Sequence, residues 1–383
     1  MKRVAILGST GSIGTSALDV LRRLGDDFEL VGLAAHSQWE TLASQVEEFR
    51  PRRAVLCAKA HFRQLVERAG ANGAELACGS EAVAELAAAD DVDVVVNAIV
   101  GASGLPPAFA ALRAGKTLAL ANKECMVMAG ELLNRTAEES GARIIPVDSE
   151  HSAIFQAMHS GCASEVRTVW ITASGGPFRT LPLEAFEAVT PEQALRHPNW
   201  AMGPKITIDS ATMMNKALEV VEAKWLFHLA VAQIRVLIHP QSIVHSLVEF
   251  CDGSTIAQLG VPDMRVPIQY ALTYPERRPS PVAPANLAAV GRLDFEEPDP
   301  ERFPALGLGY RAAEAGGTLG AVLSAANEVA VKAFLEGRLR FTHIPRLVAD
   351  VMDRHRLIDH PTAERIDEAD RWARKEAGTW MAR

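Results

Sequence analysis

Residues 3–14 read Arg-Val-Ala-Ile-Leu-Gly-Ser-Thr-Gly-Ser-Ile-Gly, and this stretch decides the fold. The apolar run 3–7 predicts a β-strand, and three glycines follow it directly before a stretch with helical periodicity. Glycine permits a tight turn and a close backbone approach to a pyrophosphate, which the N-terminus of the next helix attracts. A glycine turn in an unrelated α/β protein is the alternative. Because the turn opens an alternating pattern, we predict a dinucleotide-binding turn.

Outward from this turn, short apolar stretches alternate with helical ones over the first 149 residues. Strands are predicted at 3–7, 29–34, 54–57, 92–98, 117–120 and 143–147, and helices at 13–24, 105–114 and 126–140. The strands are apolar without alternation, as in a parallel sheet that is covered on both faces. The sequence therefore predicts an α/β fold with an N-terminal Rossmann-like domain over residues 1–149.

The pattern changes after residue 149. Longer strands are predicted at 166–173, 234–238, 243–249 and 255–259, with helices at 151–159 and 212–228, which indicates an α+β domain over 150–274. Residues 275–303 are rich in proline and acidic side chains and predict an extended linker. From 304 to 383 the pattern is helical, with stretches at 309–315 and 319–336 and further helices after Pro345 and Pro361.

Composition excludes several classes of protein. The chain has 383 residues, 48% of them hydrophobic, and a formal net charge of −8, which argues against nucleic acid or an anionic membrane as a partner. No apolar run approaches the length of a membrane span. The chain begins Met-Lys-Arg and enters a strand at once, so we expect no signal peptide. Five scattered cysteines without a Cys-x-x-Cys pair favour reduced thiols, and we expect a soluble cytoplasmic protein.

Acidic side chains in two distant stretches predict a metal site. Asp148 and Glu150 lie two apart at the end of the predicted strand 143–147, so in extended geometry they point the same way. Asn215 and Glu219 lie four apart and share one face of a helix, with Lys216 beside them. Hard oxygen ligands of this kind suit Mg²⁺ or Mn²⁺. A helix-capping pair and a salt-bridged solvent face are the alternatives for each stretch alone.

Two stretches refine the cofactor prediction. An NAD enzyme usually places an acid at the end of the second strand, where this chain has His36, Ser37 and Gln38. The first two of these can accept a 2′-phosphate, so we favour NADPH over NADH, although both residues also suit a solvated loop. The run 121–124, Ala-Asn-Lys-Glu, follows a strand on the edge where such sheets bind ligands. An ordinary helix start capped by asparagine is an equal alternative there.

A loop with glycine hinges predicts a lid. Residues 174–178 run from a strand into a flexible turn, and residues 197–203, His-Pro-Asn-Trp-Ala-Met-Gly, carry large side chains between turn formers. Local core anchoring is the alternative for such a loop. Ser210 precedes the predicted helix 212–228, whose first turns carry an asparagine and a lysine, so this helix start predicts a site for a substrate phosphate. We assign His239 and His245 structural or supporting roles, and Met264 could cover one nicotinamide face or lie in the core.

With these segments in order, the chain resembles the 1-deoxy-D-xylulose 5-phosphate reductoisomerase family. The matching stretches are 8–14, 97–104, 121–124, 146–156, 174–178, 197–203, 209–225, 239–246 and 258–267. The resemblance implies isomerisation and NADPH-dependent reduction of a ketose phosphate in the non-mevalonate isoprenoid pathway. It also implies a divalent metal (Mg²⁺, Mn²⁺ or Co²⁺), a V-shaped homodimer whose interface lies in the α+β domain, and a C-terminal helical domain.

The resemblance also implies roles for individual residues. The metal ligands would be Asp148, Glu150 and Glu219. The substrate would contact Lys123, Ser149, Glu150, Ser174, His197, Trp200, Ser210, Asn215, Lys216 and Glu219, with Lys123 near the reacting carbons and His197 counted with the catalytic set. NADPH would contact Thr10, Gly11, Ser12, Ile13, Asn122, Glu124, Met202, Gly203 and Met264. Independently of the resemblance, the place of His36, Ser37 and Gln38 after the second strand predicts that they also contact the cofactor.

The chain departs from the family pattern in few places. Residues 36–38 are His-Ser-Gln, where a glycine followed by a basic or small residue and asparagine is usual, and Cys125 stands where serine is frequent. Two other functions were weighed. Another NADP-dependent dehydrogenase needs no three-carboxylate metal site joined to a phosphate clamp. A non-catalytic NADPH sensor has no use for the lysine, carboxylates and lid together.

Overall fold

The chain folds into two compact units in this computed structural model, which describes residues 1–200 and 202–382. Unit 1 comprises Met1–Cys125, Leu133–Asp148 and Asp263–Val282. Unit 2 comprises Met126–Leu132, Ser149–Pro262 and Ala283–Arg383. The predicted α/β class, with a Rossmann-like sheet, a second sheet and a helical C-terminal region, is confirmed.

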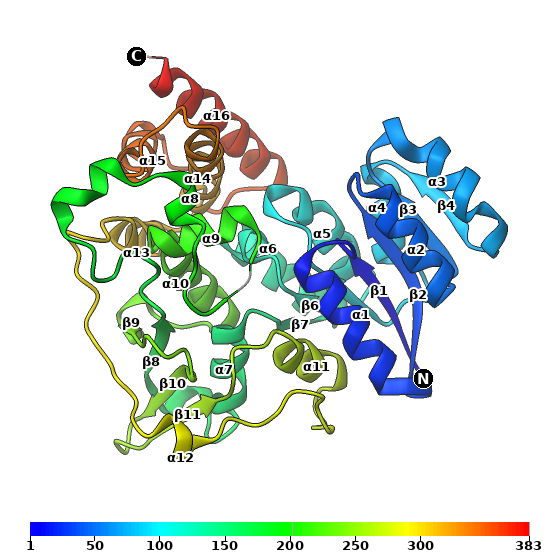
Figure 1. Cartoon of the computed structure of the whole chain (residues 1–383), viewed down its shortest axis with the longest axis horizontal. Helices are drawn as coiled ribbons and strands as arrows, with labels where there is room; N and C mark the ends of the chain where they lie inside the picture. The colour runs from blue at the N-terminus through cyan, green and yellow to red at the C-terminus, as the bar shows by residue number, and fades with distance from the viewer. Residues whose placement is uncertain (201, 383) are drawn as a thin grey trace. The chain divides into compact units, whose positions relative to one another are not determined.

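Unit 1 is built on a parallel sheet. In the described part of the chain this sheet has seven strands in the order β4-β3-β2-β1-β5-β6-β7 (Figure 1). The strands are β1 (Lys2–Leu7), β2 (Phe28–Ala35), β3 (Arg53–Leu56), β4 (Glu75–Cys78), β5 (Val94–Asn97), β6 (Thr117–Leu120) and β7 (Arg143–Pro146). The last four residues of β1 are fully buried, as expected for a strand covered on both faces.

Each helix of unit 1 except the last connects one strand of the parallel sheet to the next strand along the chain. The helices are α1 (Ser12–Leu24), α2 (Trp39–Phe49), α3 (Phe62–Ala69), α4 (Ser80–Ala88), α5 (Leu105–Arg113), α6 (Lys123–Ser140, assigned partly to unit 2) and α11 (Arg265–Thr273). α11 lies far along the chain from the others and packs against α1. Its Arg265 Nη1 donates to Asp19 Oδ2 of α1 at 3.0 Å, so a salt bridge fixes this contact.

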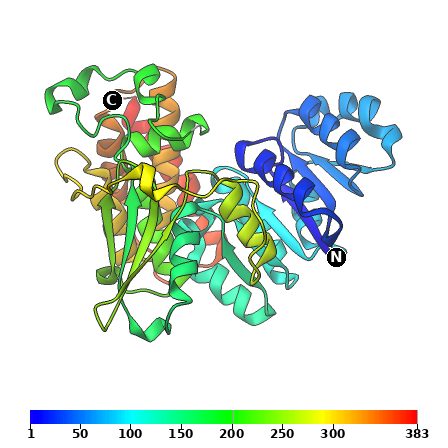
Figure 2. The ribbon, with the colours of Figure 1, turned by 60° about the horizontal axis from the view of Figure 1, so that its bottom comes forward.

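Unit 2 contains the second sheet. Its described strands are β8 (Val166–Ala173), β9 (Ile234–Ile238), β10 (Val244–Phe250) and β11 (Thr255–Leu259), in the order β11-β10-β8-β9. Figure 2 shows them side by side, with the extended yellow segment around residue 295, which pairs with the end of β9 through Glu296 and Ile238. The helices α7 (Ser149–Met158) and α10 (Met214–Phe227) pack on this sheet.

The remaining helices of unit 2, except the exposed one at Leu287–Val290, surround one continuous core. They are α8 (Pro191–Ala194), α9 (Pro204–Ala211), α12 (Leu287–Val290), α13 (Ala305–Ala315), α14 (Leu319–Leu335), α15 (His343–Arg354) and α16 (Ala363–Met381). α14 is buried along most of its length and contacts α13, α15 and α16. No helix in the described part of the chain is both long enough and apolar enough to span a membrane.

Several predicted elements change. Strand β4 was missed because residues 75–78 are short and only partly buried, so their pattern resembles a loop. α9 and α11 were not predicted, and in each helix a proline (Pro204 or Pro267) occupies the first turn, where no amide donor is needed. The extended geometry proposed for residues 148–150 is wrong. β7 ends at Pro146 and α7 begins at Ser149, so Glu150 lies in a helix.

Candidate active site

The glycine turn predicted from the sequence joins β1 to α1 in unit 1. Gly8 has a φ of +85°, and a Cβ atom there would lie 2.6 Å from the carbonyl oxygen of Ala98. A Cβ atom at Gly14 would lie 2.3 Å from the carbonyl oxygen of Gly8. Both positions therefore require glycine. The turn includes Thr10 and Gly11, and Ser12 and Ile13 open α1, so the four residues surround a helix N-terminus that favours an anion.

The end of β2 lies next to this turn. The amide of Gly8 donates to the carbonyl of Ala34 at 2.8 Å, so the two strand ends are neighbours. His36, Ser37 and Gln38 follow β2 directly and all three are exposed. No acid stands among them to hold a ribose hydroxyl pair, which agrees with a 2′-phosphate at this position.

Asn122 supports the loop after β5. Its side-chain oxygen accepts from the amide of Cys125 and caps α6, and its Nδ2 donates to the carbonyl oxygens of Ile99 and Gly101 at 2.5 and 2.9 Å. The capping alternative considered for this residue is therefore correct. A cofactor contact by Asn122 or by the buried Glu124 remains a prediction.

Lys123 begins α6 and is buried with Asp148. Lys123 Nζ lies 2.5 Å from Asp148 Oδ2, and the two side chains are 7% and 10% exposed. Because both charges are largely removed from water, each charged side chain would be unfavourable without the other. Met264 also lies in unit 1, immediately before α11, and the Arg265–Asp19 salt bridge holds this segment against α1.

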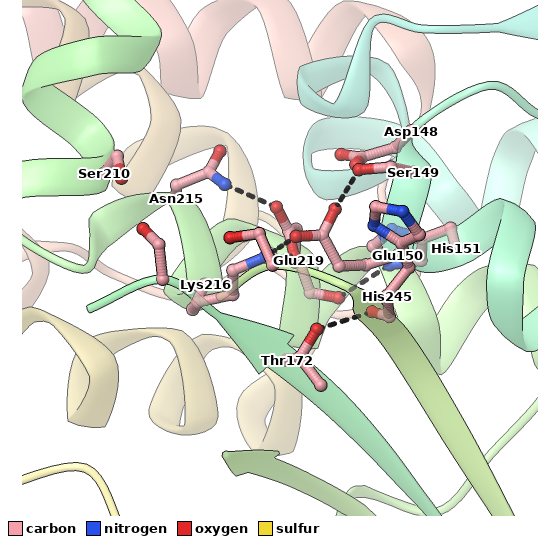
Figure 3. A network of polar contacts seen from close by, with 12 residues as sticks. Asp148, Ser149, Glu150, His151, Thr172, Ser210, Asn215, Lys216, Glu219 and His245 are labelled. Atoms are coloured by element: carbon pink, nitrogen blue, oxygen red, sulfur yellow. Dashed lines mark hydrogen bonds and ion pairs between the residues drawn. The ribbon is translucent and has the colours of Figure 1, made fainter. Parts of the chain in front are cut away.

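In unit 2, two glutamates and a lysine come together from α7 and α10, namely Glu150, Glu219 and Lys216 (Figure 3). Lys216 Nζ lies 2.6 Å from Glu150 Oε1 and 2.5 Å from Glu219 Oε2. A carboxylate oxygen of Glu150 lies within 4.8 Å of a carboxylate oxygen of Glu219. Glu219 is 0% exposed, and its Oε1 accepts a hydrogen bond from Asn215 Nδ2 at 2.5 Å. The helical spacing predicted for Asn215 and Glu219 is therefore confirmed.

Asp148 and Ser149 precede Glu150 in the chain. Ser149 opens α7, and its Oγ donates to Glu150 Oε2 at 2.6 Å. Asp148 ends unit 1 and is joined to Ser149 by a peptide bond, so covalent continuity keeps it near the first turn of α7. Residues 148 and 150 are therefore separated by a strand-to-helix turn and do not lie on one extended strand.

A histidine lies between two serines at the other end of this region. His197 Nε2 lies 3.1 Å from Ser174 Oγ and 3.1 Å from Ser210 Oγ. Its Nδ1 accepts hydrogen bonds from the amides of Asn199 and Trp200 at 3.2 and 2.9 Å. Nδ1 therefore carries no proton, and the neutral ring donates from Nε2. Burial, followed by the charge of Lys216, lowers the pKa of His197 to about 4.

The helix start predicted for the phosphate site differs in detail. Ser210 belongs to α9, and α10 begins at Met214 after a residue with a φ of +60°. Asn215 and Lys216 lie in the first turn of α10 as predicted. A Cβ atom at Gly176 would lie 2.8 Å from the carbonyl oxygen of Ser210, so the turn after β8 packs closely on the end of α9.

The predicted lid contains Trp200, Met202 and Gly203. Trp200 lies against His245, with ring centroids 6.4 Å apart. His245 is 7% exposed, and burial lowers its pKa. Ala201, also part of the predicted lid, lies outside the described residues. Asn199 fixes the loop by donating from Nδ2 to Pro240 O and Ser242 Oγ at 2.7 and 2.8 Å.

His151 is buried beside this carboxylate pair and Glu222 is buried on α10, and neither is among the site residues predicted from the sequence. A signal was present in the spacing. His151 directly follows Glu150, and Glu222 lies three residues after Glu219 on the same helix.

Comparison with known proteins gives a consistent result. Residues 4–130 match the family model described as 1-deoxy-D-xylulose 5-phosphate reductoisomerase. Residues 144–227 and 259–376 match two models of the C-terminal domains of the same family. A reductoisomerase of that name from Pelotomaculum thermopropionicum is 53% identical over 98% of this chain and 97% of its own. One from Chlorobium chlorochromatii is 52% identical over the full length of both chains.

Solved structures show the same likeness. The reductoisomerase of Zymomonas mobilis in complex with NADPH has a TM-score of 0.92 and 42% identity, with 99% of each chain covered. A reductoisomerase in complex with NADPH, fosmidomycin and magnesium has a TM-score of 0.94 and 40% identity, covering 100% of this chain and 98% of its own.

Proposed function

This chain belongs to the 1-deoxy-D-xylulose 5-phosphate reductoisomerase family, and we propose that the glycine turn of unit 1 and the residues at α7 and α10 of unit 2 serve that activity. The enzyme is an NADP-dependent oxidoreductase. It isomerises and reduces 1-deoxy-D-xylulose 5-phosphate to 2-C-methyl-D-erythritol 4-phosphate with NADPH and a divalent metal, as a step of the non-mevalonate isoprenoid pathway. The buried Glu219 and the partly buried Glu150, bridged by a lysine, are the single observation that carries this proposal.

The chemistry of the donor set fits a divalent cation. Two carboxylates with oxygens within 4.8 Å of one another repel, and Glu219 is fully buried, so the pair needs positive charge. The ammonium of Lys216 supplies that charge here. We assign Asp148, Glu150 and Glu219 as ligands of Mg²⁺, with Mn²⁺ and Co²⁺ as alternatives. A bound divalent cation would polarise the substrate carbonyl and stabilise negative charge on its oxygens.

The substrate phosphate is assigned to the serine–histidine cluster. His197 donates from Nε2 while its protonation is fixed by two backbone amides, so it serves as a neutral donor. Ser174 and Ser210 flank it. The remaining contacts to the substrate phosphate are assigned to Ser149, Asn215 and Lys216. The flexible side chain of Lys216 can turn from the carboxylates to the phosphate. Such remote contacts align a small substrate for reaction.

Lys123 is assigned next to the reacting carbons, because Asp148 holds its ammonium at the end of β6. A charged, buried donor there can stabilise negative charge that develops on the substrate oxygen. Trp200 and Met202 would cover the substrate and exclude water when the loop closes. NADPH would occupy the turn at 10–13 and residues 36–38, with Asn122, Glu124, Gly203 and Met264 as further contacts. Residues 1–149 then form the NADPH domain and 150–274 the catalytic domain. Residues 275–303 form the linker, and 304–383 the helical domain.

The test is an assay of NADPH oxidation by the purified protein. We expect oxidation only when deoxyxylulose phosphate and Mg²⁺, Mn²⁺ or Co²⁺ are both present. Turnover in excess chelator would refute the assignment of a metal-dependent reaction. The substitution Glu219→Gln preserves shape and removes charge, so it should abolish metal-dependent activity. A hydroxamate phosphonate such as fosmidomycin should inhibit, because it offers metal-chelating oxygens and a phosphonate together.

A homodimer is proposed through the sheet of unit 2. Val169 and Ile171 of β8 are fully buried, so by strand alternation Trp170 projects from the opposite face. Its cross-strand partner Leu247 and the next partner Ala257 extend this partly exposed apolar row across three strands. Apolar rows of this kind mark protein interfaces.

Sedimentation of the full chain tests this proposal. The protein should sediment as a dimer, and Leu247→Glu should shift it toward the monomer without unfolding it. A matched change on the exposed surface, Arg63→Glu, should not. A monomeric unchanged protein at micromolar concentration would contradict the dimer. The five free cysteines agree with a cytoplasmic location, which we also propose.

A further inference from the structure

The residue that follows Glu150 connects the two carboxylate-bearing helices. His151 lies on α7 and is 0% exposed. Its Nε2 lies 3.1 Å from the carbonyl oxygen of Glu219 on α10. A carbonyl oxygen only accepts, so Nε2 carries a proton and donates. The ring also stacks on Phe227 of α10, with centroids 6.1 Å apart and planes 9° apart, so its orientation is fixed by packing as well.

A second buried carboxylate lies on the other side of this ring. Glu222 is 0% exposed, and its Oε2 lies 3.4 Å from His151 Nδ1. A buried carboxylate is costly unless it is paired, and this contact pairs Glu222 with His151 when one proton lies between Nδ1 and Oε2. The imidazole thus faces an acceptor at each of its two nitrogens, and both acceptors belong to one face of α10.

We propose that His151 is a positioning residue that fixes Glu150 and Glu219 relative to each other, and that Glu222 orients His151. This rests on the proposed function, which assigns Glu150 and Glu219 as ligands of a divalent cation. The backbone of one ligand is tied to the side chain next to the other, across elements far apart in the sequence. A divalent cation needs its oxygens at fixed separation, and such supporting contacts are worth about 10- to 100-fold in metal affinity.

Direct metal binding by Glu222 is the competing explanation. Glu222 lies one helical turn beyond Glu219, and the oxygens of acidic residues at this spacing can share a cation. The contact with His151 is compatible with both explanations, because a Glu222 oxygen and an imidazole nitrogen within 4.8 Å of each other can also share one cation. The two explanations differ in how the effects of the two residues combine.

The experiment measures Mn²⁺ binding to the full-length protein without NADPH or substrate, from the electron paramagnetic resonance signal of free Mn²⁺. His151→Phe keeps the ring volume and the stacking but removes the donor. It should raise the Kd for Mn²⁺ by about 10- to 100-fold. His151→Met, which fills the space without a ring, should do the same, and His151→Gln, which retains a donor, should recover part of the affinity. His159→Phe, at an exposed position directly after α7, is the matched control and should bind as the unchanged protein does.

Double substitution separates the two roles of Glu222. If Glu222 acts through His151, Glu222→Gln should weaken binding less than His151→Phe does, and the combined variant should bind no more weakly than His151→Phe alone. If the two substitutions instead weaken Mn²⁺ binding by factors that multiply, and Glu222→Gln weakens it as much as Glu219→Gln does, the assigned role of Glu222 is wrong. The Michaelis constant for metal should rise in the His151 variants, while kcat at saturating metal stays within about threefold, because a positioning contact is compensated once the ligands are occupied.

The controls distinguish this inference from the proposed function. If the unchanged protein fails to bind Mn²⁺, or Glu219→Gln binds equally well, the assignment of the metal ligands is wrong. If both of those controls behave as expected and the His151→Phe and His151→Met variants still bind Mn²⁺ as tightly as the unchanged protein, only the role of His151 is wrong.

Discussion

Replacing Lys216 with methionine should make the stability of this protein strongly dependent on divalent metal. The Lys216 ammonium lies 2.6 Å from Glu150 Oε1 and 2.5 Å from Glu219 Oε2, and its side chain is only 5% exposed. Methionine fills much of the same volume without charge. In the variant the two carboxylates therefore face each other without this cation, unless a metal ion takes its place.

The size of the effect follows from the burial of the pair. Removing one partner of a buried ion pair costs roughly 3–5 kcal/mol, and the 17% exposure of Glu150 places this case at the lower end, near 3 kcal/mol. At about 2–4 °C per kcal/mol, the melting temperature in chelator should fall by roughly 6–12 °C. A metal ion at about 100 times its Kd returns near 2.7 kcal/mol, which offsets most of that loss.

The assay is thermal unfolding of both proteins in chelator and in millimolar Mg²⁺. The variant should gain far more from Mg²⁺ than the unchanged protein, in which the lysine already neutralises the carboxylates. Lys332→Met, at a side chain that is 75% exposed, is the control and should leave both melting temperatures unchanged. An equal Mg²⁺ effect on the unchanged protein and Lys216→Met would refute the view that ammonium and metal occupy the same carboxylates.

Three further predictions concern separate parts of the molecule. The pKa of His197 is lowered to about 4 from 6.5, so as the pH falls the unfolded chain takes up this proton before the folded protein does. The folded protein should therefore lose stability between pH 6.5 and 4. Urea titrations of His197→Gln should show a smaller loss of stability over the same range. Gly14→Ala places a Cβ 2.3 Å from the Gly8 carbonyl oxygen, so it should cost about 1–3 kcal/mol in chemical denaturation and weaken NADPH binding measured by fluorescence. Arg265→Met removes the half-exposed salt bridge from α11 to Asp19, so the Michaelis constant for NADPH should rise a few-fold while that for metal stays constant.

The parallel sheet was predictable because its signals are local. Buried strands read as short apolar runs, and six of the runs identified in the sequence coincide with strands of unit 1. β4 was not predicted because this edge strand, whose side chains are partly exposed, lacks a continuous apolar run. The strands at 166–173, 234–238 and 255–259 were predicted to the residue, and the first two carry buried side chains among more exposed ones.

The carboxylate region was predicted in part. The four-residue spacing of Asn215 and Glu219 needs only a helix to bring them together, and they are hydrogen-bonded. The geometry at residues 148–150 was wrong, because the apolar strand signal could not show where the chain turns into α7. His151 and Glu222 had no local signal of partnership, since their contact depends on the packing of α7 against α10.

By itself the sequence determined the alternation of strands and helices, the glycine turn and the identity of the charged residues, because these depend on neighbours a few positions away. Only the tertiary structure decided which charges meet. Lys216 bridges acids from two helices, His197 has its proton fixed by the backbone of its own loop, and His151 ties Glu219 to the neighbour of Glu150. Each of these contacts joins groups whose separation is set by helix packing or by loop conformation. The pattern of residues along the sequence does not determine either one.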